Sequence, residues 1–270
     1  MANIQVSVLN QSTVLTDDQV KAAVPDLQTQ VHDHFAPAWG IDADLTFIPK
    51  GQNPAPGSWW LVILDNSDQA GALGYHDYTT DGLPIGKVFA GTDMQYGSQW
   101  TVTTSHELLE MLADPDINLT AAATDPNQPN PTQFYAYEVA DACEADQFGY
   151  NINTTPVSDF VFPAWFESFR QAGSTQFDYQ KQIRQPFQLL AGGYIGVLNP
   201  TGGEGWTQIT AERVPRTHLH RGPAGSRRER RRTPRHQWLK SLPLGEIKTR
   251  ARDYHTRLAA HLKKAAAAAS

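Results

Sequence analysis

The sequence predicts an α+β fold in which a mixed sheet packs on two helices, followed by a basic C-terminal extension. The segments up to residue 113 read in the order strand, helix, strand, strand, strand, long helix. A hydrophobic content of 40% and seven Trp residues are enough for a packed core. Most of the basic residues follow residue 210. We therefore expect a metal-binding domain at 1–210 and a basic arm with a terminal helix at 211–270.

The first elements follow from local patterns. Residues 4–8 alternate apolar and polar side chains, as a half-buried strand does. Thr16 is a suitable N-cap for the next helix. We expect Pro25 to interrupt this helix, which resumes over residues 26–37.

Apolar runs predict three further strands at residues 45–48, 59–64 and 85–89. The long helix is expected at 99–113 and ends there because the residue before Pro115 avoids the helical region.

Two regions after this helix have different compositions. Residues 121–132 are rich in Asn, Pro and Asp, which is typical of an exposed loop, and a short ordered unit at 134–144 follows. The aromatic residues of 159–169 are expected in the core or in a pocket wall.

The cysteine content limits the kind of metal site that the chain can build. Cys143 is the one cysteine, so neither an intrachain disulfide nor a CxxC site is possible, and metal ligands must be His or carboxylate. We expect Cys143 itself to be a small buried residue. The N-terminus has no basic and apolar leader pattern, and no stretch approaches the roughly 18 apolar residues of a membrane span. We therefore expect a cytoplasmic protein, with export by a route without a cleaved signal left open.

The segment His106-Glu107-x-x-Glu110 carries the strongest chemical signal. Residues four apart on a helix share a face, so His106 and Glu110 can reach one ion. Glu107 points about 100° away and can address a water bound to that ion. The alternative is an amphipathic helix whose polar residues are solvated.

A zinc site of the catalytic kind needs a third protein ligand and leaves the fourth position to water. Glu138 and Asp141 are both candidates, and they would share a face if their segment is helical. The competing interpretation of this segment is a surface helix with an acidic edge.

The segments 105–110, 114–115 and 138–144 together resemble the shared core of the exordium-like (phosphate-induced) proteins of plants and their bacterial relatives. In those proteins a Ser-His-Glu helix that ends in Asp-Pro or Asn-Pro precedes a Glu-Ile-(Ala/Gly)-Asp-x-Cys signature. The likeness covers about residues 100–170. The order of elements is also similar to that of the zincin metallopeptidases, in which a mixed sheet precedes the active-site helix.

The resemblance implies a zincin-like domain with an HExxE active-site helix. The chain departs from the zincin pattern at Glu110, where those enzymes carry a second His, and it lacks the signal peptide of the plant proteins. A carboxylate at this position makes the ion less electrophilic and shifts preference toward harder ions such as Mn²⁺ or Ca²⁺.

Two functions are expected from these residues. The first is a zinc-dependent, peptidase-like hydrolase that acts on a protein or peptide. Its divalent metal, zinc, is held by His106, Glu110 and either Glu138 or Asp141, and Glu107 is the general base that activates the metal-bound water. The second is a non-catalytic, metal-stabilised binding or structural protein.

The basic arm differs sharply in charge from the rest of the chain. Residues 211–270 contain 16 of the 22 Lys and Arg and four acidic residues, a net charge of +12, whereas the first 210 residues carry −18. The arm can dock on its own acidic body or on an acidic partner. The Arg-rich run at 227–232 has no interleaved aromatic residues for base stacking, so nucleic-acid binding is not expected as the main function.

The segment His76-Asp77-Tyr78 has two interpretations. It can line the cleft beside the metal, where His or Tyr stabilises a developing oxyanion, or it can be a turn whose polar groups face solvent. His32 and His34 lie on different faces of a helix and are expected to be ordinary polar positions.

Overall fold

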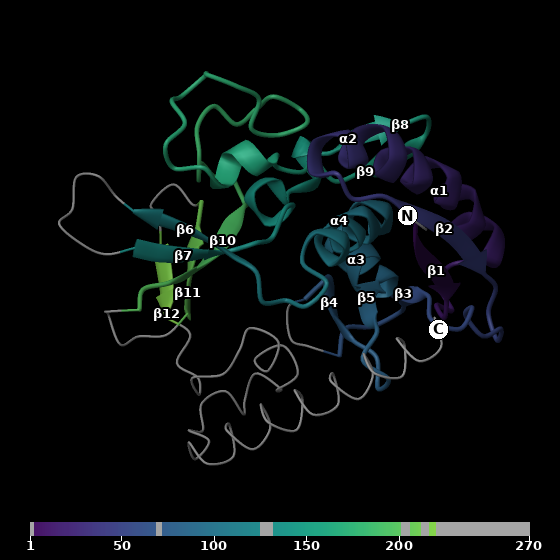
Figure 1. Cartoon of the computed structure of the whole chain (residues 1–270). Helices are drawn as coiled ribbons and strands as arrows, with labels where there is room; N and C mark the ends of the chain where they lie inside the picture. Colours follow the sequence, from purple (N-terminus) through teal and green to yellow (C-terminus); the bar gives the residue numbers. More distant parts are fainter. Residues whose placement is uncertain (1–2, 69–71, 125–131, 201–205, 212–215, 220–270) are drawn as a thin grey trace, which may run out of the picture.

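The computed structural model describes residues 3–68, 72–124, 132–200, 206–211 and 216–219 (Figure 1). These residues form two five-stranded sheets, one two-stranded sheet and several helices, which confirms the α+β class. Within them, no helix is long and apolar enough to cross a membrane.

The first sheet has the strand order β2-β1-β3-β5-β4. Three of its four pairings are parallel, and β4 pairs antiparallel with β5 at one edge. The strands are β1 (Ile4–Asn10), β2 (Ala43–Ile48), β3 (Trp59–Leu64), β4 (Gly74–Tyr78) and β5 (Pro84–Phe89). Strands β1, β2, β3 and β5 contain the segments expected from the sequence, whereas β4 was not expected.

The two main helices pack on one face of this sheet. Helix α1 (Asp17–Thr29) contacts β1 and β2, and helix α4 (Trp100–Ala113) contacts β3, β4 and β5. Both helices belong to the same hydrophobic core as the inward-facing residues of the sheet. The predicted layer of a mixed sheet on two helices is therefore present.

Helix α1 begins with a capping box, in which the Thr16 hydroxyl accepts from the Gln19 backbone N–H and the Gln19 side chain accepts from the Thr16 N–H. The expected interruption at Pro25 is wrong, because α1 continues to Thr29. Pro25 removes one backbone bond, and the buried apolar face of the helix outweighs that loss. The chain continues as a π-helical turn, η1 (Gln30–Phe35), and a short helix, α2 (Ala36–Trp39).

The second sheet is antiparallel, with the order β12-β11-β10-β7-β6. Its strands are β6 (Thr120–Thr124), β7 (Thr132–Ala136), β10 (Tyr194–Leu198), β11 (Trp206–Thr210) and β12 (Arg216–Leu219). The loop expected at 121–132 is wrong at its start, because residues 121–124 belong to strand β6 and pair with β7. Residues 125–131, between the two strands, lie outside the described residues. Of the basic arm predicted at 211–270, the structure describes residue 211 and β12. The rest of the arm, including its predicted terminal helix, lies outside the described residues.

Irregular segments complete the core between the sheets. They are a short helix α3 (Ala90–Tyr96), the 3-10 turns η2 (Asp141–Cys143), η3 (Asp146–Phe148) and η4 (Pro163–Phe166), and the hairpin of β8 (Tyr150–Ile152) and β9 (Thr155–Val157). Phe160, Trp165 and Phe166 are buried, as expected for the aromatic segment, whereas Phe169 is exposed.

Asp159 and Asp178 are fully buried in this irregular region. The Asp159 Oδ1 atom accepts from the backbone N–H groups of Phe160 and Gln180, at 2.8 and 3.1 Å. Burial and the neighbouring Asp178 carboxylate raise the pKa of Asp159 to about 8. The folded chain therefore keeps a proton on Asp159 that the unfolded chain releases near pH 4.

Because the pKa of Asp159 is higher in the folded chain than in the unfolded chain, we predict that the Asp159–Asp178 pair destabilises the fold as pH rises. Between about pH 4 and pH 8 the unfolded state binds fewer protons, so the free energy of unfolding falls by up to about 1.4 kcal/mol per pH unit. The Asp159→Asn variant keeps the acceptor oxygen and places an amide donor toward Asp178. We expect it to raise the melting temperature relative to wild type at pH 9 and to change it little at pH 4. Thermal unfolding followed by circular dichroism checks this, and an equal shift at both pH values would contradict it.

Candidate metal centre

Helix α4 is the most deeply buried helix of the described chain. Residues 101–113 are all buried, and His106, Glu107 and Glu110 are 6%, 5% and 1% exposed. This excludes the alternative in which the polar residues of the helix are solvated. Charged groups in such a position need compensating partners, because leaving water is costly.

Hydrogen bonds hold α4 in place at its polar positions. The Ser105 hydroxyl donates to Gln30 Oε1 of η1 at 2.6 Å and accepts from the Ser158 backbone N–H at 3.0 Å. The Thr103 hydroxyl donates to Asp93 Oδ1 of α3 at 2.8 Å. The helix is thereby fixed to three other segments, which sets the direction in which His106 and Glu110 point.

Three donor atoms converge beside α4. The His106 Nε2 atom lies 3.4 Å from Glu110 Oε1 and 3.3 Å from Asp141 Oδ1. The three residues are buried, and their donor atoms all lie within 4.8 Å of one another. The i, i+4 pair expected from the sequence is therefore joined by Asp141.

The separations match those of ligands around one ion. Two donors bonded at about 2.0–2.2 Å, at the roughly 90–120° angles of four- or five-coordinate ions, lie about 2.8–3.8 Å apart. Both measured separations fall in this range. One imidazole and two carboxylates form a donor set that suits a divalent cation.

The backbone around Asp141 is held by the segment before β10. Gly193 approaches so closely that a Cβ atom there would lie 2.3 Å from the Ala142 carbonyl oxygen. The Leu190 backbone N–H donates to that same oxygen at 2.9 Å. The Ala140 N–H donates to Glu110 Oε1 at 3.3 Å, which ties the turn to the helix.

Glu138 takes a different place from Asp141. The two residues do not share a helix face as supposed, because Asp141 begins the turn η2 and Glu138 precedes it in non-helical chain. Both are buried, which also excludes the surface helix with an acidic edge. The Glu138 Oε2 atom lies 3.8 Å from His76 Nε2.

His76 is the site residue that the sequence did not identify as a ligand. It lies on β4, fully buried, with its Nδ1 atom 3.6 Å from Glu107 Oε2 and 3.8 Å from Glu110 Oε2. The solvent-facing turn considered for residues 76–78 is therefore wrong. The Asp81-Gly82 turn is a signal for the hairpin of β4 and β5 that would have indicated this strand.

The electrostatics of the cluster reflect crowded carboxylates. Burial lowers the pKa of His106, but the Glu110 charge, helped by Asp141 and Glu107, outweighs it and holds that pKa well above its usual value. Burial and Glu110 raise the pKa of Asp141 to about 7. Burial also raises the pKa of Glu144, against the opposing effect of His106. A bound cation would relieve this crowding.

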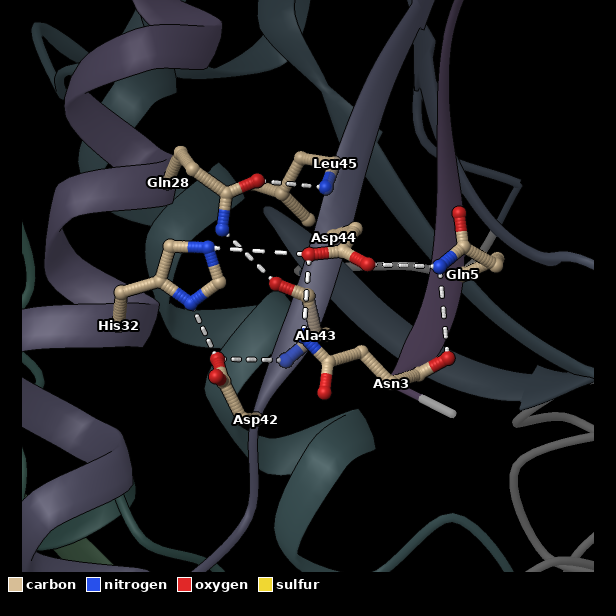
Figure 2. Close-up of polar contacts among 8 residues, drawn as sticks. All are labelled: Asn3, Gln5, Gln28, His32, Asp42, Ala43, Asp44 and Leu45. Atoms are coloured by element: carbon tan, nitrogen blue, oxygen red, sulfur yellow. Dashed lines mark hydrogen bonds and ion pairs between the residues drawn. The ribbon is translucent and has the colours of Figure 1, made fainter. Parts of the chain in front are cut away.

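Other titratable residues lie away from the cluster. His32 contacts Asp42 and Asp44 near the start of β2, where Asp44 also accepts from Gln5 (Figure 2). His34 stacks on Tyr179. These are the ordinary polar positions expected from the sequence.

Cys143 is buried beside the site as a free thiol, and burial raises its pKa well above the usual value. It is therefore the small buried residue that the sequence predicts.

Comparisons with known proteins add no relative. No family model, no curated protein and no solved structure matches the chain. Conclusions about function therefore depend on the geometry of the residues.

We predict that a divalent ion binds between His106, Glu110 and Asp141, and that His106→Ala abolishes this binding because the substitution deletes the nitrogen donor of the group. Elemental analysis and calorimetric titration of the purified chain with Zn²⁺ measure this. The matched control, His32→Ala, removes a histidine that also contacts two carboxylates and should leave metal binding unchanged. Wild-type affinity in the His106→Ala variant would contradict the assignment.

Proposed function

We propose that this chain is a metal-dependent, peptidase-like hydrolase whose divalent ion, zinc in the first instance, is held by His106, Glu110 and Asp141. The observation that carries the proposal is the convergence of their three buried donor atoms at ligand-like separations. A bound divalent ion supplies Lewis acidity, which acidifies a coordinated water and polarises a carbonyl oxygen.

Glu107 is the proposed general base. It follows His106 on α4, so its carboxylate points about 100° away around the helix axis, and its Oε2 atom lies 3.6 Å from His76 Nδ1. A carboxylate can take a proton from a water beside it and pass that proton on. The side chain accepts the proton of the attacking water and delivers it to the leaving group.

Two observations favour an extended peptide as the substrate. Strand β4, which carries His76, forms the edge of the first sheet, and an extended peptide can add to a sheet edge through backbone hydrogen bonds. A cavity of about 470 Å³ is lined by Leu73, just before β4, and by Glu144, whose pKa responds to the charges of His106 and Glu110. We infer that substrate approaches the donor group from the side of this cavity.

The order of elements supports a zincin-like interpretation by analogy of fold. A mixed sheet precedes the helix with His106, as in the zincin metallopeptidases, and the acidic segment follows as in the exordium-like proteins. The carboxylate ligand at Glu110 reduces the electrophilicity of the ion, so we expect slower hydrolysis than with two imidazole ligands.

A structural ion is the second candidate function, and the burial of the donor group favours it. His106, Glu110 and Asp141 expose 6%, 1% and 3% of their surface, as expected for a closed site. In that case removal of the ion lowers the melting temperature, and no substitution changes a hydrolytic rate.

The Glu107→Gln variant distinguishes the two functions. The amide keeps the shape of the side chain but cannot accept a proton, so we expect hydrolysis to fall at least about 100-fold while the ion beside His106 is retained. Digestion of an unfolded protein and of a peptide library, followed by mass spectrometry, gives the rate.

Glu167→Gln is the matched control, since Glu167 is partly exposed and pairs with Arg170. Its rate should equal that of wild type. An unchanged rate in Glu107→Gln would show that Glu107 is not the base.

A further inference from the structure

A second group of donor atoms lies on the other side of Glu110. The His76 Nδ1 atom lies 3.6 Å from Glu107 Oε2 and 3.8 Å from Glu110 Oε2. These three buried residues offer donor atoms within 4.8 Å of one another, as the group around His106 does.

Glu110 belongs to both groups through different oxygens. Its Oε1 atom lies 3.4 Å from His106 Nε2, whereas its Oε2 atom lies 3.8 Å from His76 Nδ1. The Ala140 backbone N–H donates to Oε1 and so fixes the orientation of the carboxylate. A carboxylate that presents one oxygen to each of two donor groups has the arrangement of a bridging ligand.

We propose that the chain holds a second divalent cation between His76, Glu107 and Glu110, so that Glu110 bridges two ions. This inference rests on the proposed ion beside His106 and makes the centre a two-metal site. The oxygen-rich donor set, with one imidazole for each ion, suits Mn²⁺ as well as Zn²⁺.

The charge of the cluster supports two ions over one. Glu107, Glu110, Glu138 and Asp141 are 5%, 1%, 2% and 3% exposed, so solvent screens none of them well. Ionised, they carry four negative charges, of which one divalent ion compensates half. One negative charge would remain even if His76 were protonated as well. Two divalent ions compensate all four while both imidazoles stay neutral, as ligands must be.

The separations around His76 are longer than a direct hydrogen bond and suit ligands of a shared cation. A charge-assisted hydrogen bond between an imidazolium and a carboxylate is about 2.7–2.9 Å long. The His76 Nδ1 atom lies 3.6 Å from Glu107 Oε2 and 3.8 Å from Glu110 Oε2. Both separations fall in the range of about 2.8–3.8 Å expected for two ligands of one ion.

Close packing of β4 on α4 places Glu107 in this group. A Cβ atom on Gly74 would lie 2.7 Å from the Glu107 Cγ atom and 2.8 Å from its Oε1 atom. Only glycine therefore fits at this point of β4, and the Glu107 carboxylate lies beneath the strand that carries His76. The absence of a side chain at Gly74 leaves space for the Glu107 carboxylate next to the His76 imidazole.

The second ion changes the role of Glu107. When the site beside His106 alone is filled, Glu107 serves as the base, whereas with both sites filled it is a ligand. Glu107→Gln should then lose one equivalent of metal as well as activity.

Titration of the metal-stripped full chain with Mn²⁺ tests the proposal. We expect wild type to bind two equivalents and to give the electron paramagnetic resonance signal of an exchange-coupled pair. His76→Ala should bind one equivalent and show the hyperfine pattern of an isolated Mn²⁺ ion. The control is His34→Ala, because His34 stacks on Tyr179 outside the cluster. This variant should still bind two equivalents of Mn²⁺.

The outcomes separate this inference from the proposed function. Binding of one equivalent by wild type, unchanged in His76→Ala and lost in His106→Ala, would overturn the second site and leave the first. Two equivalents in His76→Ala would overturn the assignment of His76, and no binding by wild type would overturn both proposals. Native mass spectrometry of the Mn²⁺-loaded wild type counts the ions without relying on the folding of any variant.

Discussion

Four carboxylates are buried around helix α4, and the segments that pack on this helix must hold them away from water. Glu107 and Glu110 lie within one turn of α4, and Glu138 and Asp141 meet them from the segment that follows β7. Removing such charges from water carries a large free-energy penalty unless opposite charge is close. Two buried imidazoles lie among these carboxylates, and cations would supply the remaining compensation. The raised pKa of Asp141, caused by burial and by Glu110, is the sign of this crowding.

The fold is arranged to hold these groups in position. Gln30 in η1 accepts a hydrogen bond from the Ser105 hydroxyl and donates one to the Ser158 carbonyl oxygen. These bonds connect α4 to η1 and to the segment after β9. On the other side of α4, Gly74 lets β4 approach closely enough to bring His76 to the cluster. At Gly193 the chain comes equally close to the turn that carries Asp141. Three separate contacts therefore bring candidate ligands from three segments, α4, β4 and the turn after β7, to one point.

The sequence predicted the parts of the site that depend on local spacing. His106 and Glu110 lie on one helix, so their separation follows from helix geometry alone. Asp141 was one of two candidates, and the choice between it and Glu138 depended on the path of a non-helical segment. His76 could not be placed, because its position depends on pairing between β4 and β5 and on contact between the strand and α4.

The fold was predictable to a similar extent. The apolar strands and the capped start of α1 follow from period and capping residues, which are local signals. The strand β6 and the continuity of α1 through Pro25 depend on pairing and burial with distant residues, which outweigh local composition. The second sheet gave little sequence signal, since its strands are short and joined by long connections.

Crystallographic anomalous scattering from the Mn²⁺-loaded chain tests the central claim most directly, because it locates each ion relative to the Glu110 carboxylate. We expect one peak bonded to His106, Glu110 Oε1 and Asp141, and a second peak beyond Oε2 beside His76. A map with no peak within bonding distance of either Glu110 oxygen would contradict it.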